Sequence, residues 1–414
     1  MKQIPYGQIN FESIIKDNCI YVDKTMYIEK LESRPNLKTV FYLRPGRFGK
    51  SLFTNMLDYY YAIDRADKFD TLFNNLYIKD YPTVNKNSYY ILNFDFSGID
   101  SNDEWNIQDF MEAFNSKVID GITQFIDRYG IELTINEKLT PSNLIGNLLT
   151  KFQSLKLENK IYIIIDEYDN FTNGILKGNA EKFLAMLTGE GFIKGFYARI
   201  KEAIKTGVVE RFFATGIAPI TLDSMTTGFN IATDITRKPQ FATMIGFSEK
   251  EVKNIIDEVL PEKTQEEKQQ IYDTMEKYYD GYRFSELSNE HVFNSTLVMY
   301  YLNNYLELGM PPSELLDINI AANFTKLGNL LTLKGNNISK KILEKAIQNQ
   351  EMDGKIVNKF ELGIMPIGEK EIQSLLFYFG YLTIGKNITD TIIRYKIPNQ
   401  VMSGIYRQAY LNKS

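Results

Sequence analysis

A run of apolar and aromatic residues that turns directly into Gly49-Lys50-Ser51 constrains this chain more than any other segment. Residues 38–51 read KTVFYLRPGRFGKS, an order that predicts a buried strand, a tight loop and the first turn of a helix. Such a loop points backbone N–H groups at a phosphate, while the lysine adds positive charge and the serine hydroxyl can join the shell of Mg²⁺. The segment therefore predicts a site for nucleotide phosphates. Its predicted members are Arg44, Pro45, Gly46, Arg47, Phe48, Gly49, Lys50, Ser51 and Leu52.

The same segment departs at one position from the phosphate-loop pattern G-x-x-x-x-G-K-[ST], because Arg44 stands where the first glycine is expected. That glycine normally relieves steric strain at the entrance of the loop. Pro45 and Gly46 follow, so the turn can form slightly later in the chain. Taken alone, the segment is explained equally well by an ordinary strand-to-helix turn.

A second segment, IYIIIDEYD from Ile161, is an unbroken apolar run that ends in Asp166 and Glu167. This composition is typical of a strand in the centre of a parallel sheet, where both faces are buried. Its carboxylates would lie at the strand end where open α/β sheets bind ligands. We predict that Asp166 holds the Mg²⁺ shell and that Glu167 accepts a proton from the attacking water. A strand that leaves the core through solvated acids is the simpler alternative, but it does not account for the loop at Lys50.

The composition narrows the chemistry available to the chain. Cys19 and His291 are the only cysteine and the only histidine among 414 residues, which nearly excludes zinc clusters and Ser-His-Asp triads. Hydrolysis would therefore depend on carboxylates, on lysine or arginine, and on a metal. The net charge of −5 does not favour a broad nucleic-acid surface, although direct nucleic-acid binding stays undecided. No apolar stretch approaches the roughly 20 residues needed to cross a membrane, and we expect a cytoplasmic protein.

Apolar runs that alternate with helical patterns predict an α/β fold, namely a P-loop NTPase of the additional-strand type with a central, mostly parallel sheet. Residues 89–98 are the candidate for the extra strand between the phosphate-loop strand and the strand of Asp166. The strand RFFATGI places Thr215 next to the γ-phosphate, where it orients water; alternatively, Thr215 caps the next turn. The predicted strands are 39–43, 89–96, 161–165 and 211–217, and the predicted helices are 51–62, 107–128, 144–157, 180–187 and 192–205.

Near residue 246 the pattern changes to charged helices. We therefore divide the chain into a domain of residues 1–246 and a mainly helical domain of residues 247–414 that ends in small strands. The segment YDGYRF at 279–284 predicts a packed turn with buried aromatic rings and with Gly281 at positive φ. The predicted helices here are 250–260 (after a capping box of Ser248 and Glu251), 265–279, 295–308, 312–317, 319–331 and 339–350, and 375–384 with 392–397 form a helix and one or two strands.

With these segments in place, the chain resembles the bacterial AAA-ATPase-like proteins that are often joined to a C-terminal PD-(D/E)XK nuclease-like domain. The matching segments follow one another through most of residues 1–290. They are IPYGQINFESI (4–14), YVDKT (21–25), FYLRPGRFGKSL (41–52), IIIDEYDN (163–170), FFATGIAPI (212–220), GFSEKEV (246–252) and YYDGYRF (278–284).

The resemblance implies a P-loop NTPase core that tolerates Arg44, because R-P-x-R-F-G-K-S is the usual loop of that family. It assigns Lys50 and Ser51, in the first Walker motif, to ATP and Mg²⁺. In the second Walker motif it assigns Asp166 to the metal shell and Glu167 to the activation of water. The nuclease-like domain would begin near the end of this chain, and residues 290–414 hold no convincing pair of carboxylates followed by E-x-K. We therefore expect no DNA cleavage by this polypeptide.

Two functions remain open at this point. The first is Mg²⁺-dependent ATP hydrolysis coupled to a conformational change, which would serve a protein partner or a nuclease-type effector, with Lys50, Thr215 and Glu167 as catalytic residues. The second is a module that binds nucleotide without hydrolysing it, or an inert scaffold; Arg44 and the lack of an obvious arginine finger motivate it. The candidates for that finger are Arg211, Arg237 and Arg283. The oligomeric state stays open.

Overall fold

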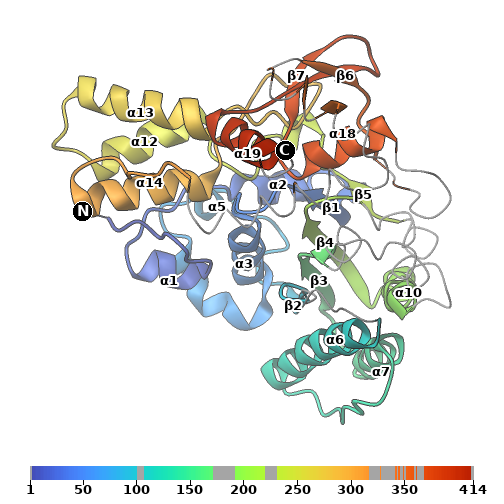
Figure 1. Ribbon diagram of the computed structural model, residues 1–414. Helices are drawn as coiled ribbons and strands as arrows, with labels where there is room; N and C mark the ends of the chain where they lie inside the picture. The colour runs from blue at the N-terminus through green and yellow to red at the C-terminus, as the bar shows by residue number, and fades with distance from the viewer. Residues whose placement is uncertain are drawn as a thin grey trace.

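A five-stranded sheet forms the centre of the molecule (Figure 1). The computed structural model describes residues 2–99, 107–170, 192–219, 231–316, 351–358 and 368–411, with single positions between 327 and 360. The strands of the central sheet are β1 (Thr39–Leu43), β2 (Tyr89–Asp95), β3 (Lys160–Asp166), β4 (Val209–Gly216) and β5 (Thr233–Asp234). The predicted α/β class is thus confirmed, while the short strand β5 was not predicted.

The strands lie side by side in the order β2-β3-β4-β1-β5, and every neighbouring pair is parallel. The strand inserted between β1 and β3 is therefore β4. The prediction that residues 89–98 form this inserted strand was wrong, because β2 lies at the edge of the sheet beyond β3. A buried strand has the same apolar pattern at either place, so the pattern predicts that a strand exists but does not predict its neighbours.

The carboxyl ends of the central strands meet at one edge of the sheet. Leu43 at the end of β1 pairs with Gly216 at the end of β4, and Asp95 of β2 pairs with Asp166 of β3. Ligands bind at this edge in open parallel sheets. The loop that follows β1 and the acids that end β3 are brought together there.

Helices cover both faces of the sheet (Figure 1). On one face α3 (Lys50–Tyr61) contacts β2 and β3, and on the other α6 (Ile107–Tyr129) contacts β2 while α10 (Phe192–Lys205) contacts β4. Strand alternation explains the two layers: Asn93 donates to Asp58 of α3, whereas Phe94 packs against the ring of Phe196 in α10. The remaining elements of this part are α1 (Phe11–Lys16), α2 (Met26–Glu32), η1 (Pro35–Leu37), η2 (Ile63–Lys68), α4 (Phe69–Leu72), α5 (Tyr77–Asp80), α7 (Pro141–Ser154) and η4 (Pro239–Phe241). The predicted helix at 180–187 lies outside the described residues.

The region after residue 246 combines helices with a second, three-stranded sheet. Its capping box is confirmed, since Ser248 and Glu251 satisfy each other's backbone N–H groups at the start of the first helix. Residues 312–316 form no helix, contrary to the prediction; Pro311 and Pro312 cannot donate backbone hydrogen bonds there. The elements are α12 (Glu249–Val259), α13 (Gln265–Tyr279), α14 (Ser295–Leu308), β6 (Met352–Gly354), α18 (Glu369–Tyr378), β7 (Thr383–Asn387), β8 (Ile393–Lys396) and α19 (Gln400–Leu411). The predicted helices at 319–331 and 339–350 lie largely outside the described residues.

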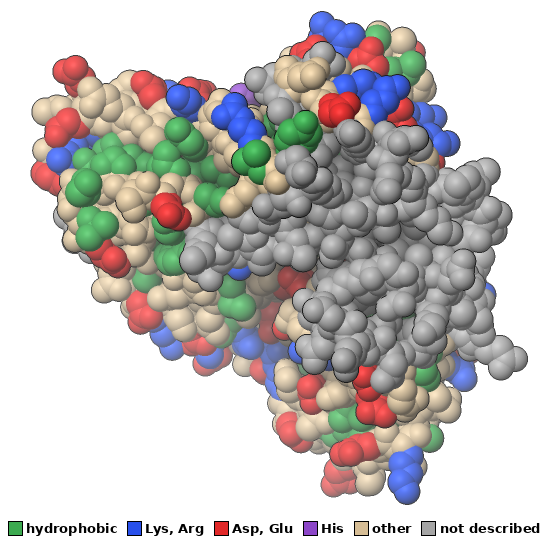
Figure 2. All heavy atoms as spheres, in the orientation of Figure 1, with side chains coloured by type: hydrophobic (Ala, Val, Ile, Leu, Met, Phe, Trp, Pro, Cys, Tyr) green, Lys and Arg blue, Asp and Glu red, His purple; other side chains and the backbone are tan. Residues whose placement is uncertain are grey.

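The surface of this region carries apolar side chains. Figure 2 shows a strip of hydrophobic side chains over α13 and α14, and Leu308 and Met310, near the end of α14, are both exposed. Within the described ranges, none of the helices has the length and apolar content needed to span a bilayer.

Candidate functional site

The loop between β1 and α3 turns through two residues in the left-handed region of φ. These residues are Arg47 (φ 66°) and Gly49 (φ 100°), and Gly49 occupies the N-cap position of α3. Glycine has no side chain with which to cap the helix, so no side chain of the N-cap residue competes with a ligand at the start of α3. The positive end of the helix dipole favours an anion at the same place.

Lys50 is the first residue of α3 and its side chain returns over the loop. The Nζ atom donates hydrogen bonds to the carbonyl oxygens of Arg44 and Pro45, each at 3.0 Å. The ammonium group therefore spans the inside of the turn. A phosphate bound at the start of α3 would lie close to this charge.

Arg44 supports the loop from outside. Its side chain is 1% exposed, and the guanidinium donates to the carbonyl oxygens of Leu43 and Thr236, both at 2.8 Å. It also donates to two further carbonyls, those of Phe241 and Ala242, at 3.2 and 3.1 Å. The residue that breaks the glycine pattern thus ties the loop to the segment 236–242, and both of its terminal nitrogens donate to carbonyl oxygens.

Aromatic side chains of the YDGYRF turn cover the outer face of the loop. Phe48 packs edge-on against Tyr282 and Phe284, with ring centroids 4.9 and 5.7 Å apart. Phe284 also stacks on the guanidinium of Arg44 at 4.2 Å. The prediction of a packed turn is confirmed, because both rings are buried and Gly281 has a φ of 91°.

The end of β3 meets the start of α3 through Asp166. Burial raises the pKa of Asp166 to about 6, while a hydrogen bond with the Ser51 side chain and the charge of Lys50 oppose this rise. The nearby carboxylates of Glu167 and Asp95 raise the pKa further. The predicted pair of metal-holding residues, Ser51 and Asp166, is therefore brought close together.

The raised pKa of Asp166 predicts that the stability of the fold depends on pH. An unfolded aspartate titrates near pH 4, so between about pH 4 and 6 the folded state alone holds the proton and stability falls as pH rises through this range. Above about pH 6, Asp166 is ionised in both the folded and the unfolded state, and the loss of stability is complete. Asp166→Asn, which removes this titration, should therefore be more stable than the wild type near pH 7 by on the order of 1–2 kcal/mol in nucleotide-free thermal melts. The difference should vanish near pH 4, and a constant difference across this range would contradict the assignment.

Glu167 has a strained backbone at the strand end. Its φ is 51°, which a residue other than glycine rarely adopts, and its N–H donates to Asp166 Oδ1 at 3.0 Å. Residues held in such conformations cluster at functional sites. Glu167 lines the cavity described below.

The residues after Glu167 hold the end of β3 against the end of β4 through hydrogen bonds. Asp169 accepts hydrogen bonds from the backbone N–H groups of Ile217 (3.0 Å) and Ala218 (2.7 Å). Thr215 donates its hydroxyl to the carbonyl of Tyr42 at 2.8 Å, which ties β4 to β1. The catalytic role of Thr215 therefore stays a prediction. Asp169 was not predicted, although it lies in the same IIIDEYDN segment as the two acids.

Gly216 allows Tyr168 and Asp169 to pack closely on the end of β4. A Cβ at this position would lie 2.6 Å from Cδ1 of Tyr168 and also against the carboxylate of Asp169. We expect Gly216→Ala to lower the free energy of unfolding by about 2–3 kcal/mol, as other overpacked cores do. Gly404→Ala is the matched control, because no atom lies within 4 Å of its Cβ position in α19. That change should be neutral or stabilise the helix by about 0.5–1 kcal/mol in urea denaturation. Equal effects of the two substitutions would contradict the packing argument.

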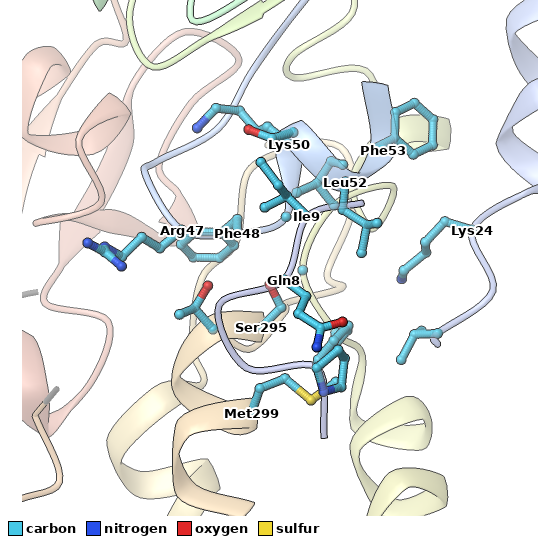
Figure 3. A pocket seen from close by; sticks show the side chains of 18 of the residues that line it. Gln8, Ile9, Lys24, Arg47, Phe48, Lys50, Leu52, Phe53, Ser295 and Met299 are labelled. Atoms are coloured by element: carbon cyan, nitrogen blue, oxygen red, sulfur yellow. The ribbon is translucent and has the colours of Figure 1, made fainter. Parts of the chain in front are cut away.

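A cavity of about 320 Å³ opens beside the loop (Figure 3). Four parts of the chain line it: residues 47–53 with Glu167, the N-terminal segments 5–9 and 20–24, residues 244–247, and the first turns of α14. Arg44, Pro45 and Gly46 are not among its lining residues. The walls contributed by the N-terminal segments and by α14 were not predicted, because nothing in the local sequence places them next to the loop.

The donor set suits a magnesium ion bound together with a nucleotide. Among the described residues, no cluster of three or more His, Cys, Asp or Glu side chains could hold a metal by itself. Mg²⁺ is commonly held by one or two protein oxygens together with substrate phosphates and water. The hydroxyl of Ser51 beside the carboxylate of Asp166 matches that requirement.

The three arginines considered for the γ-phosphate are engaged elsewhere. Arg211 lies near the start of β4, away from the carboxyl edge, and donates to the carbonyls of Leu31 and Leu37. Arg237 pairs with Glu286, and Arg283 donates to backbone carbonyls that include Ser285 and Gly385. None of the three lines the cavity, whereas Lys24, Arg47 and Lys50 do.

Comparisons with known proteins show the family of the chain. A family model described as "Predicted AAA-ATPase" matches residues 5–226. A curated relative from Azotobacter chroococcum mcd 1, an uncharacterized protein in the vnfD 5' region, is 24% identical over 392 residues. The match covers 93% of this chain and 64% of the relative, so the chain spans less than two thirds of that protein's length.

Proposed function

The chain belongs to the predicted AAA-ATPase family, and on this premise we propose that it binds ATP with Mg²⁺ beside the loop at Lys50 and hydrolyses it. The closeness of Ser51 to Asp166, which lowers the pKa of that carboxyl, is the observation that carries the proposal. It joins the start of α3 to the end of β3, where Lys50, Ser51 and Glu167 line one cavity and Asp166 lies beside Ser51.

Each of these groups has a role in the proposed reaction. The amides at the start of α3 and the ammonium of Lys50 bind the phosphates. Ser51 and Asp166 hold Mg²⁺, which when bound neutralises charge on the phosphate oxygens. Glu167 accepts a proton from the attacking water, and Thr215 positions the end of β4 beside it.

The packing around the loop supports coupling of hydrolysis to a conformational change. A shift of the loop on nucleotide exchange would move Phe48 and Arg44, and both contact the YDGYRF turn. Pro45 contacts a second segment of the C-terminal region, because a Cβ on Gly380 would lie 2.9 Å from its Cγ. Close-packed contacts of this kind transmit displacements rather than absorb them. We propose that the movement serves a protein partner or a nuclease-type effector.

Titration of the purified chain with Mg·ATP tests the proposal. Lys50→Ala should weaken binding at least 100-fold, because it removes the charge beside the phosphates. Lys38→Ala is the control, since Lys38 pairs with Glu210 at the opposite end of β1. It should bind like the wild type. Absence of ATP binding by the wild type, or equal binding by Lys50→Ala, would contradict the proposal, whereas binding without phosphate release would leave a nucleotide-gated module.

A further inference from the structure

We infer that the first turn of α14, through the hydroxyl of Ser295, is a second phosphate-binding element that closes on the nucleotide from the C-terminal region. This inference rests on the proposed function, since it concerns the same cavity. It adds a contact from outside the loop and the strand-end acids, and it orients the nucleotide in the cavity.

The start of α14 lies directly against the loop. Ser295 Oγ is 3.5 Å from the position that a Cβ on Gly49 would occupy, next to the N-cap of α3. The N–H of Thr296 donates to the carbonyl of Arg47 at 3.4 Å. Ser295 and Thr296 both line the cavity, and Figure 3 shows Ser295 and Met299 on the helix that borders it.

The Ser295 hydroxyl borders the cavity and has no hydrogen-bond partner among the described residues. Its side chain is only 7% exposed, and within the part of the chain that the structure describes, no group accepts from or donates to its Oγ. A hydroxyl that lines the cavity without a protein partner can donate a hydrogen bond to a ligand bound there.

Charge identifies the ligand group as phosphate. Two helices, α3 and α14, begin at this cavity, at Lys50 and Ser295. The positive end of α3 and the ammonium of Lys50 favour an anion. In α14 the amides of Thr296 and Leu297 already donate to Arg47 and Asn294, so the Ser295 hydroxyl is the donor that this helix offers. A polyphosphate held by α3 therefore has its oxygens within reach of a donor on α14.

The next turn of α14 fits the other end of a nucleotide. Met299 lies four residues after Ser295, on the same face of the helix, and lines the cavity with Ile9 and Leu52. These apolar side chains suit a base rather than a phosphate. The nucleotide is therefore oriented along α14, with its phosphates at Ser295 and its base toward Met299.

Calorimetric titration with two probes tests the inference: a non-hydrolysable ATP analogue with Mg²⁺, and Mg²⁺·tripolyphosphate, which has no base. Ser295→Ala should weaken both probes about 10-fold, the usual effect of a hydrogen bond to a charged group. Ser295→Asp should weaken both at least 100-fold by repulsion, and Ser295→Thr, which keeps the hydroxyl, should restore much of the affinity. Ser154→Ala is the control at the end of α7, where the hydroxyl only bonds the carbonyl of Lys151. Thermal melts report whether each variant is folded.

Parallel losses for the two probes support the inference. A loss for the ATP analogue alone would place Ser295 at the nucleoside and overturn it, as would binding of the analogue but not of tripolyphosphate by the wild type. Unchanged affinities in Ser295→Ala and Ser295→Asp, with binding lost in Lys50→Ala, would overturn the inference but leave the proposed function standing. A wild type that binds neither probe would overturn both.

Discussion

Arg44→Gly, which restores the glycine of the phosphate-loop pattern, is expected to destabilise the protein by about 3–5 kcal/mol instead of improving it. The substitution removes a buried guanidinium that donates to four carbonyl oxygens and lies between the rings of Tyr42 and Phe284. Those carbonyls would lose their partners, and a cavity would replace the side chain. Urea denaturation monitored by circular dichroism measures the loss.

Arg47→Gly is the matched control in the same loop. Arg47 is exposed, and its φ of 66° is one that glycine adopts without strain. Its replacement should change the free energy of unfolding by less than about 0.5 kcal/mol. If Arg44→Gly unfolded at the same urea concentration as the wild type, the structural role assigned to Arg44 would be wrong.

Glu167→Gln is expected to reduce steady-state phosphate release by about 10²–10⁴-fold while nucleotide affinity changes only a few-fold. The amide keeps the size of the side chain and can still occupy the cavity wall, but it cannot accept a proton from water. A coupled phosphate-release assay and a binding titration on the same preparation separate the two quantities.

Glu210→Gln controls for a lost carboxylate elsewhere on the sheet. Glu210 pairs with Lys38 near the start of β4, far along the strand from the site. Its substitution should leave phosphate release unchanged. Unaltered turnover in Glu167→Gln would exclude Glu167 as the base, and equal losses in binding and turnover would assign it to binding instead.

The strands and the helix start that carry the candidate site are predicted from the sequence close to their observed bounds. Strand β1, the start of α3 and the acids that end β3 all carry short-range signals: an apolar run, a glycine at a turn and charged residues at a strand end. The order of the strands does not carry such a signal. Residues 89–95 and 209–216 both form strands of the sheet, and neither segment indicates by its own sequence that it lies between β1 and β3; the sheet places 209–216 there.

The sequence pattern does not indicate the tertiary contacts of the loop. Arg44 looks like a defect in the motif, and its role depends on the carbonyls of residues 236–242 and on Phe284, which lie about 190 to 240 positions later in the chain. Ser295 likewise looks like an ordinary helix start. The roles of both residues depend on contacts with residues that are distant in sequence. The periodicity of a single sequence does not predict such contacts.

A crystal structure of the chain with Mg²⁺ and a non-hydrolysable ATP analogue would show whether the loop at Lys50 holds a nucleotide. We expect triphosphate density at the N-terminus of α3, with Lys50 Nζ turned from the loop carbonyls to the phosphates and with Mg²⁺ between Ser51 and Asp166. Density for the analogue at another surface, or a soaked crystal in which Lys50 still bonds Arg44 and Pro45 while the cavity holds no nucleotide, would contradict this expectation.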